Sequence, residues 1–225
     1  MNLQVNSPYT KCPYRCPYCV AGVSSTYPFA DTLYNQYPAE YLRKLVAVVK
    51  KHNITTVVLT GSTEPTLFPA WLWYVCTTLR PLGIKVELQT KNYHWRSTYD
   101  TIGVIAYSHD KIPTHKRLPI KDCLVRDVFL WNKALTARSI VDYFKSQPNV
   151  DQLTIKQLVA SSYGIKSIDD HIAKITKPMT IVDKIIFQLN GAWVDKDCAD
   201  SEGRYLIYRT DGHIYQKWSD TLPIG

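Results

Sequence analysis

Three cysteines stand close together near the start of the chain, in the segment KCPYRCPYCV. Cys12, Cys16 and Cys19 have the spacing C-x3-C-x2-C, and a loop of this length can place all three sulfur atoms around one inorganic centre. Thiolates are soft ligands that select zinc, copper(I) or iron–sulfur clusters. The segment therefore predicts a metal centre. The alternative is an accidental motif, or one with a redox or structural role only.

The number of clustered thiolates separates the candidate metals. A structural zinc ion takes four ligands, and no second Cys pair or Cys/His pair has the usual zinc spacing. A [4Fe–4S] cluster normally takes four thiolates, so three thiolates leave one iron open to a substrate or cofactor. The other cysteines, Cys76, Cys123 and Cys198, stand singly, which argues against a second cluster. We therefore expect one [4Fe–4S] cluster bound by the clustered cysteines.

This spacing, with Tyr18 directly before the last cysteine, closely resembles the signature of the radical S-adenosylmethionine (radical SAM) superfamily. The resemblance implies that the open iron chelates S-adenosylmethionine, and that one electron from the reduced cluster cleaves its C–S bond. The resulting 5′-deoxyadenosyl radical would abstract a hydrogen atom from a substrate. The resemblance also implies that Tyr18 contacts the adenine ring and that a reductase such as flavodoxin or ferredoxin is a partner.

A second segment, LTGSTEPTL, resembles the GGEP segment with which that superfamily binds the methionine ammonium group. The resemblance implies a cofactor-binding role for Gly61, Ser62, Thr63 and Glu64, although the second glycine of the pattern is absent. A carboxylate such as Glu64 opposite an ammonium group makes a charge-assisted contact. Without the cysteines, the same residues would be an ordinary strand-to-helix turn with Pro65 near a helix start.

The resemblance implies four further cofactor contacts. Thr90 and Asn92 follow an expected strand and would reach the ribose hydroxyls, and Ser108 would bind the methionine carboxylate. Ile155 would pack on the adenine ring. The alternative for the residues after the strand is a solvated loop.

Alternating strand and helix patterns must position these residues. Leu42, Leu45, Val46 and Val49 have the i, i+3, i+4, i+7 spacing of a buried helix face, and the segment ITTVVL is typical of a buried parallel strand. Strands are expected at residues 3–5, 54–59, 84–89, 104–107, 123–130 and 153–159, and helices at 38–52, at 69–82 and after a cap at Thr136.

These patterns indicate right-handed βαβ units, and six are too few for a closed eight-stranded barrel. We therefore expect an α/β fold, an open partial (β/α)6 TIM-like barrel. A C-terminal β-hairpin is expected at 205–218, where Asp211-Gly212 suits the positive φ angles of a tight turn. The resemblance covers residues 1–160 as the radical SAM core, and 161–225 would be a C-terminal extension of the same domain.

Composition limits the compartment and the partners. The 225 residues contain 45% hydrophobic residues, no apolar run long enough for a membrane span and no signal segment, so we expect a cytoplasmic protein without a membrane partner. The formal net charge of +8 favours anionic ligands.

Arg126 and Lys156 lie in apolar strands, where a charge needs a partner or ligand. We interpret both as catalytic residues that contact substrate, although Arg126 could instead face outward.

The leading hypothesis is a radical SAM enzyme acting on a nucleotide, nucleobase or nucleic acid. One alternative is an activase that installs a glycyl radical on a protein partner. A peptide-modifying enzyme is disfavoured because further cysteine-rich cluster domains are absent. A non-enzymatic Fe–S or zinc-binding module is the remaining alternative.

Overall fold

A sheet of nine strands runs through the part of the chain that the computed structural model describes. This part consists of residues 1–14, 16, 19, 33–61, 63–95, 101–114, 120, 122–157, 170, 173–175, 194–198, 205–216, 220 and 222–224. Its strands are β1 (Asn2–Ser7), β2 (Thr56–Gly61), β3 (Lys85–Thr90), β4 (Ile102–His109), β5 (Leu124–Trp131), β6 (Gln152–Gln157), β7 (Val194–Cys198), β8 (Tyr205–Tyr208) and β9 (Ile214–Tyr215). Its helices are α2 (Leu33–Gln36), α3 (Pro38–Lys51), η1 (Pro65–Leu67), α4 (Pro69–Leu79), η2 (Arg80–Leu82) and α5 (Ala137–Lys145).

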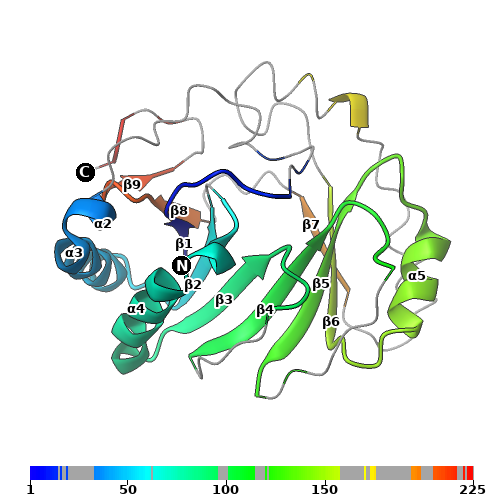
Figure 1. Cartoon of the computed structure of the whole chain (residues 1–225), viewed down its shortest axis with the longest axis horizontal. Helices are drawn as coiled ribbons and strands as arrows, with labels where there is room; N and C mark the ends of the chain where they lie inside the picture. The colour runs from blue at the N-terminus through cyan, green and yellow to red at the C-terminus, as the bar shows by residue number, and fades with distance from the viewer. Residues whose placement is uncertain are drawn as a thin grey trace.

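The strand order is β7-β6-β5-β4-β3-β2-β1-β8-β9, and every neighbouring pair is parallel except β8–β9. The sheet is not closed, because β7 and β9 are its two edges. Figure 1 shows the strands in this curved arrangement. The expected open α/β partial barrel is confirmed. The sheet extends beyond the six expected strands, because β7 and β8 also pair in parallel.

Helices cover one face of this sheet. Figure 1 shows α3 and α4 at the β1–β3 side and α5 at the β5–β6 side. Tyr41 and Leu45 of α3 and Trp71 of α4 are fully or almost fully buried against strand residues such as Leu3 and Leu88. Burying each large apolar side chain contributes roughly 1.5–3 kcal/mol. The three expected helices are confirmed. No helix among the described residues is long and apolar enough to cross a membrane.

Alternation along the strands sends the remaining side chains to the opposite face, which we call the inner face. Because the register is parallel, positions at the same level of neighbouring strands share a face. Many inner-face residues are polar, among them Gln4, Asn6, Thr60, Glu87, Gln89, Ser108, Arg126, Gln152, Thr154 and Lys156. The sheet therefore separates an apolar, helix-covered side from a largely polar side.

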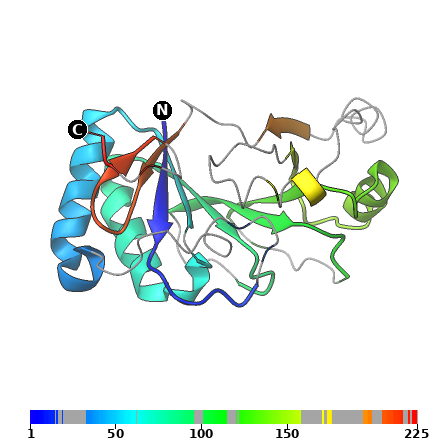
Figure 2. The ribbon, with the colours of Figure 1, turned by 90° about the horizontal axis from the view of Figure 1, so that it is seen from above.

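The C-terminal hairpin joins this sheet beside β1. Figure 2 shows the red β8–β9 hairpin next to blue β1, and β8 pairs with β1 from Asn2 opposite Tyr205. The expected hairpin is confirmed, but the expected turn geometry is wrong. Gly212 has a φ of 80°, whereas Asp211 has no positive φ. The Arg209 N–H instead donates to the carbonyl of His213 at 3.1 Å, which closes a longer loop.

Gly61 should tolerate no side chain. Its φ is 138°, and a Cβ would lie 2.7 Å from the Ser7 nitrogen and 2.8 Å from the Asn6 Cα. Gly61→Ala should therefore lower the free energy of unfolding by about 1–3 kcal/mol, measured by urea denaturation. Gly103→Ala is the matched control, because a Cβ there meets nothing within 4 Å. Equal stability of the two variants would contradict the close approach of β1 and β2.

Candidate functional site

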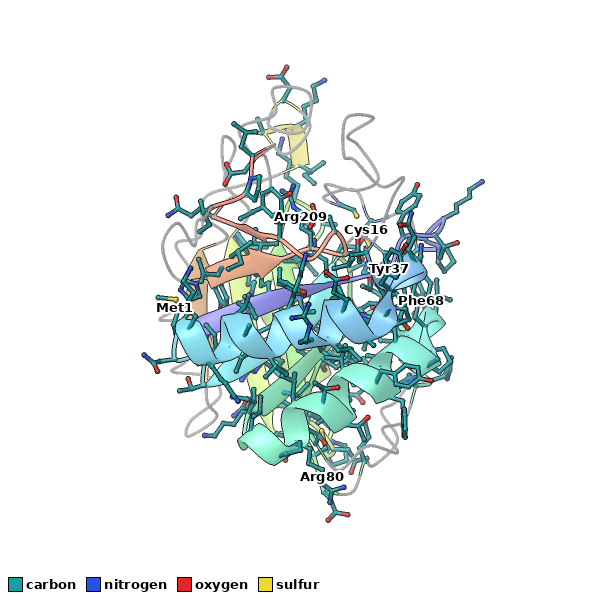
Figure 3. The ribbon with its side chains drawn as sticks, turned by 90° about the vertical axis from the view of Figure 1, so that its left-hand side faces the viewer. Met1, Cys16, Tyr37, Phe68, Arg80 and Arg209 are labelled. Carbon is teal, nitrogen blue, oxygen red and sulfur yellow. The ribbon has the colours of Figure 1, made fainter. Side chains whose placement is uncertain are left out.

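The candidate site lies at the carboxyl edge, which we define as the edge where the parallel strands β1–β6 end. The cysteine loop follows β1, and the segment containing Glu64 follows β2. Figure 3 shows Cys16 at the same end of the molecule as Phe68, with Met1 at the opposite end. In open α/β sheets, ligands bind in the crevice outside the carboxyl ends of the strands.

The Glu64 carboxylate is the best-connected group of this edge. It is 5% exposed, and it caps η1 by accepting the Thr66 N–H at 3.1 Å on Oε1. Oε1 also accepts the hydroxyls of Thr66 at 2.8 Å and Thr90 at 2.5 Å, and Oε2 accepts the Lys91 N–H at 2.9 Å. The carboxylate thus joins the β2–η1 segment to the end of β3. Oε2 keeps acceptor capacity for a further donor.

Asn92 orients the hydroxyls that donate to Glu64. Its N–H donates to Thr90 Oγ1 at 2.9 Å, and its Nδ2 donates to Thr66 Oγ1 at 3.1 Å. Each hydroxyl has one proton, so a hydroxyl that accepts from Asn92 can direct that proton to Glu64. The structure therefore brings Thr90, Asn92 and Glu64 together in one network.

Backbone contacts bring Gly61 and Thr63 to the end of β1. Gly61 approaches the backbone of Asn6 and Ser7, and the Ser7 hydroxyl donates to the Thr63 carbonyl at 3.4 Å. Thr63 is 7% exposed, and its Oγ1 has no hydrogen-bond partner among the described residues. A buried hydroxyl without a partner at this edge suits a polar ligand. Ser62 lies outside the described residues.

Tyr14 links the cysteine loop to Glu64. Burial raises the pKa of Tyr14, and the negative charges of Glu64, Cys12 and Cys16 raise it further. The cysteine loop and the Glu64 segment follow the neighbouring parallel strands β1 and β2, so both lie at the same edge of the sheet. Tyr18 lies outside the described residues.

The three cysteines of the loop supply thiolate donors, the ligands that an iron–sulfur cluster takes. All three are partly buried, and the Cys19 N–H donates to the Cys16 carbonyl at 3.1 Å. No three His, Cys, Asp or Glu side chains in the described ranges are arranged to hold one metal ion. A [4Fe–4S] cluster does not require that arrangement, because each thiolate binds a different iron. The donor set, together with Glu64 and the Thr63 hydroxyl, fits a cluster with S-adenosylmethionine.

Arg126 does not lie with these groups. It is on the inner face in the first half of β5, five residues or about 16 Å before the carboxyl end. Its Nη1 pairs with Glu87 at 2.7 Å, and its Nε donates to Gln152 at 2.9 Å. The neighbouring Asp127 faces the helix side, where its Oδ1 lies 2.8 Å from His109 Nε2 and both side chains are fully buried. Both charged side chains of this strand therefore have partners within the protein.

The other predicted residues divide between the two faces. Lys156 and Ser108 are the penultimate residues of β6 and β4, on the inner face near the carboxyl edge. Ile155 is fully buried on the opposite face, in a cluster with Phe129 and Ile140 under α5. The structure therefore places Lys156 and Ser108 on the inner face of the sheet, near the candidate site. It places Ile155 on the opposite, helix-covered face.

Sequence reasoning missed several groups of the carboxyl edge. Lys91 Nζ pairs with Asp110 Oδ1 at 2.6 Å, and Asn132 Nδ2 donates to the Asp110 carbonyl at 2.9 Å. Each of these residues directly follows β3, β4 or β5. Only their position directly after a strand could have identified these residues from the sequence, because residues that follow parallel strands meet at one edge of the sheet.

Comparisons with known proteins support the fold. No protein-family model matches the chain, and no curated protein matches its sequence. The structure of Streptococcus suis SuiB bound to precursor peptide SuiA matches with a TM-score of 0.64 and 12% identity, over 100% of this chain and 62% of SuiB. SuiB bound to S-adenosylmethionine matches with a TM-score of 0.56 and 12% identity, over 96% and 58%. The chain thus spans about three fifths of the SuiB chain, and the likeness is one of fold.

The pKa of Tyr14 should report its distance from Glu64. Glu64→Gln removes a negative charge, so the pKa should fall toward its ordinary value of 10.0 and stay above it, because burial is the larger cause. Carbon-13 NMR of labelled tyrosine rings, assigned with Tyr14→Phe, measures this change. Glu40→Gln, an acid on α3, is the control and should leave the pKa unchanged. An unchanged value in Glu64→Gln would contradict the proximity.

Proposed function

We propose that this chain is a radical SAM enzyme that uses one [4Fe–4S] cluster and S-adenosylmethionine. The observation that carries the proposal is the shared edge: the three-thiol loop after β1 and the Glu64 network after β2 lie together at the carboxyl edge. A protein with this fold binds S-adenosylmethionine, which supports the same cofactor here.

Cys12, Cys16 and Cys19 would hold the cluster. When bound, the cluster and S-adenosylmethionine supply a 5′-deoxyadenosyl radical that removes a hydrogen atom from the substrate. A reductase such as flavodoxin or ferredoxin would supply the electron. All three cysteines are partly accessible, which is compatible with electron delivery from outside.

Glu64 would bind the methionine ammonium group of the cofactor. Its donors are neutral hydroxyl and backbone groups, so its negative charge is not cancelled by an ion pair among the described side chains. Thr90 and Asn92 act as positioning residues, because their hydrogen bonds fix Glu64. The buried Thr63 hydroxyl would donate to or accept from the cofactor, and Ser108 lies on the face where the methionine carboxylate could reach it.

A peptide is the substrate class that the observations favour. A protein with this fold binds a precursor peptide, and that match covers 100% of this chain. The polar inner face offers amide and hydroxyl groups such as Gln89 and Ser108, which suit the N–H and C=O groups of a peptide backbone. The main argument for a phosphate at the reacting end is weakened, since Arg126 pairs with Glu87 far from the carboxyl edge.

A nucleotide or nucleic acid is the second candidate. Lys156 on the inner face near the carboxyl edge and the net charge of +8 favour an anionic substrate. Because Lys156 lies on this face near the carboxyl edge, its replacement can distinguish a peptide substrate from a nucleotide or nucleic-acid substrate.

The cluster gives the first test. Anaerobic reconstitution should load about four irons and four sulfides per chain. Reduction in the presence of S-adenosylmethionine should then yield 5′-deoxyadenosine. Replacing Cys12, Cys16 and Cys19 by Ala should abolish both, whereas Cys76→Ala and Cys123→Ala should preserve both. One tightly bound zinc without iron uptake would refute the proposal.

A second variant separates cluster binding from cofactor binding. Glu64→Gln should keep the iron content and weaken S-adenosylmethionine binding about tenfold, the effect of losing one charge-assisted hydrogen bond. Asp142→Asn, an exposed acid on α5, is the control. If Glu64→Gln binds S-adenosylmethionine as tightly as wild type, Glu64 is not part of the cofactor site. The assignment of the cluster to the three cysteines would be unaffected.

Lys156 gives the test of substrate class. If the substrate is a peptide, binding of a labelled single-stranded RNA should be weak, should fall steeply with salt and should be equal in wild type and Lys156→Gln. The measurement is fluorescence anisotropy of the reconstituted protein at two salt concentrations. Lys133→Gln, an exposed lysine after β5, is the control. Loss of RNA binding about tenfold in Lys156→Gln alone would favour the nucleotide candidate.

A further inference from the structure

Helix α4 is largely apolar on its outer side as well as on its inner side. Residues 65–79, PTLFPAWLWYVCTTL, include no charged residue. The inward side chains of α4, such as Trp71 and Leu72, are buried in the core. A surface helix normally carries charged or polar residues on its outer side, and a helix that is hydrophobic all round is normally buried. Figure 3 shows α4 beside α3 in front of the sheet, so its outer side is available to a partner.

The outer side of α4 exposes large aromatic side chains. Trp73 is 50% exposed and Tyr74 is 45% exposed, and their rings pack edge to face with centroids 5.1 Å apart. Leu67 before this helix and Tyr37 at the start of α3 are also exposed. Figure 3 shows Tyr37 at the same end of the two helices as Phe68, which precedes α4. Exposed apolar patches of a few hundred Å² mark interaction sites in proteins.

The exposed residues of α4 have a spacing that is the same in both directions. Ala70, Trp73, Tyr74 and Thr77 are exposed at positions i, i+3, i+4 and i+7 of one helix side, which we call the α4 face. Their order is small, large, large, small. Two antiparallel copies of α4 about a two-fold axis would place Trp73 against the partner subunit's Tyr74, and Ala70 against the partner subunit's Thr77. A two-fold interface requires this kind of self-complementarity.

The absence of charge on the α4 face also favours a second copy of this chain over another protein. The formal net charge of +8 makes two copies repel each other across their charged surfaces. On the α4 face two copies can meet without bringing like charges together. A strongly acidic partner would find no opposite charge there, although opposite charges are what attract such partners.

We propose that the α4 face is the two-fold interface of a homodimer. Tyr37, Trp73 and Tyr74 are about half exposed and an aromatic side chain buries about 150–250 Å², so with Leu67 each copy offers roughly 400 Å². Smaller neighbouring groups bring the total for both copies to about 1,000 Å², the lower limit of a specific interface. The dimer is therefore reversible, with a micromolar dissociation constant. The α4 face shares no residue with the cofactor site, so the dimer goes beyond the proposed function.

Sedimentation velocity of the reconstituted full-length protein tests the dimer. The average mass should rise from that of one chain toward that of two as the protein concentration increases through the micromolar range. Raising the salt concentration should tighten the dimer, because salt screens the repulsion between two basic chains and does not weaken an uncharged contact. The mass of a single chain at every concentration, or dissociation of the dimer by salt, would overturn the inference.

Charged substitutions at the centre of the α4 face locate the interface. Trp73→Glu and Trp73→Lys should each lose dimerisation, because two like charges would meet near the axis. An equal mixture of the two variants should dimerise again, because opposite charges then meet. Leu124→Glu, at an exposed hydrophobic residue of β5 outside the α4 face, is the control and should dimerise like wild type. Equal iron content per chain checks that all three variants are folded.

Three results of this experiment would contradict the interface. These are dimerisation of either Trp73 variant alone, a mixture of the two that stays monomeric, and loss of the dimer in Leu124→Glu. Each would overturn the homodimer and leave the radical SAM proposal intact, because the α4 face contains none of the residues assigned to the cluster or to S-adenosylmethionine.

Discussion

The parallel pairing of β1 to β6, with one register shift between β3 and β4, sets which residues meet at each edge and on each face of the sheet. Because every strand points the same way, all six end at one edge, where Glu64 and Lys91 meet from different strands. The same register sends Val57 and Leu88 to the helices and Glu87 to the inner face. A slip of one residue would exchange the two faces, so the apolar core and the polar inner face fix the register together.

The position of Glu64 shows how this edge holds a buried charge. Burying an isolated carboxylate costs several kcal/mol, and here four hydrogen bonds from Thr66, Thr90 and Lys91 offset that cost. Asn92 donates hydrogen bonds to the hydroxyl oxygens of Thr90 and Thr66, and so orients their protons toward Glu64. Because the donors come from two segments, the carboxylate also ties the β2–η1 segment to β3. A group held this way is already oriented before a ligand arrives, which lowers the free-energy cost of binding.

Local signals predicted most of the fold and part of the site. Apolar spacing predicted α3, and Thr136 caps α5 as expected, with its Oγ1 accepting the Ser139 N–H at 3.1 Å. The strand β7 was missed because its sequence, VDKDC, has no apolar pattern and its pairing comes from β6. The face of Ile155 and the partner of Arg126 could not be predicted either. Face depends on register across the sheet, and Glu87 lies 39 residues before Arg126, two strands away.

The two ends of the inner face differ in how their charges are compensated, and this difference decides what each can attract. Glu64 at the carboxyl edge accepts hydrogen bonds from neutral groups and has no ion pair with a described side chain, so its carboxylate suits a cation such as an ammonium group. Arg126 at the amino edge is paired with a carboxylate, so it attracts an anion little by itself. A charged residue in an apolar strand therefore indicates a ligand only after its partners within the fold are known.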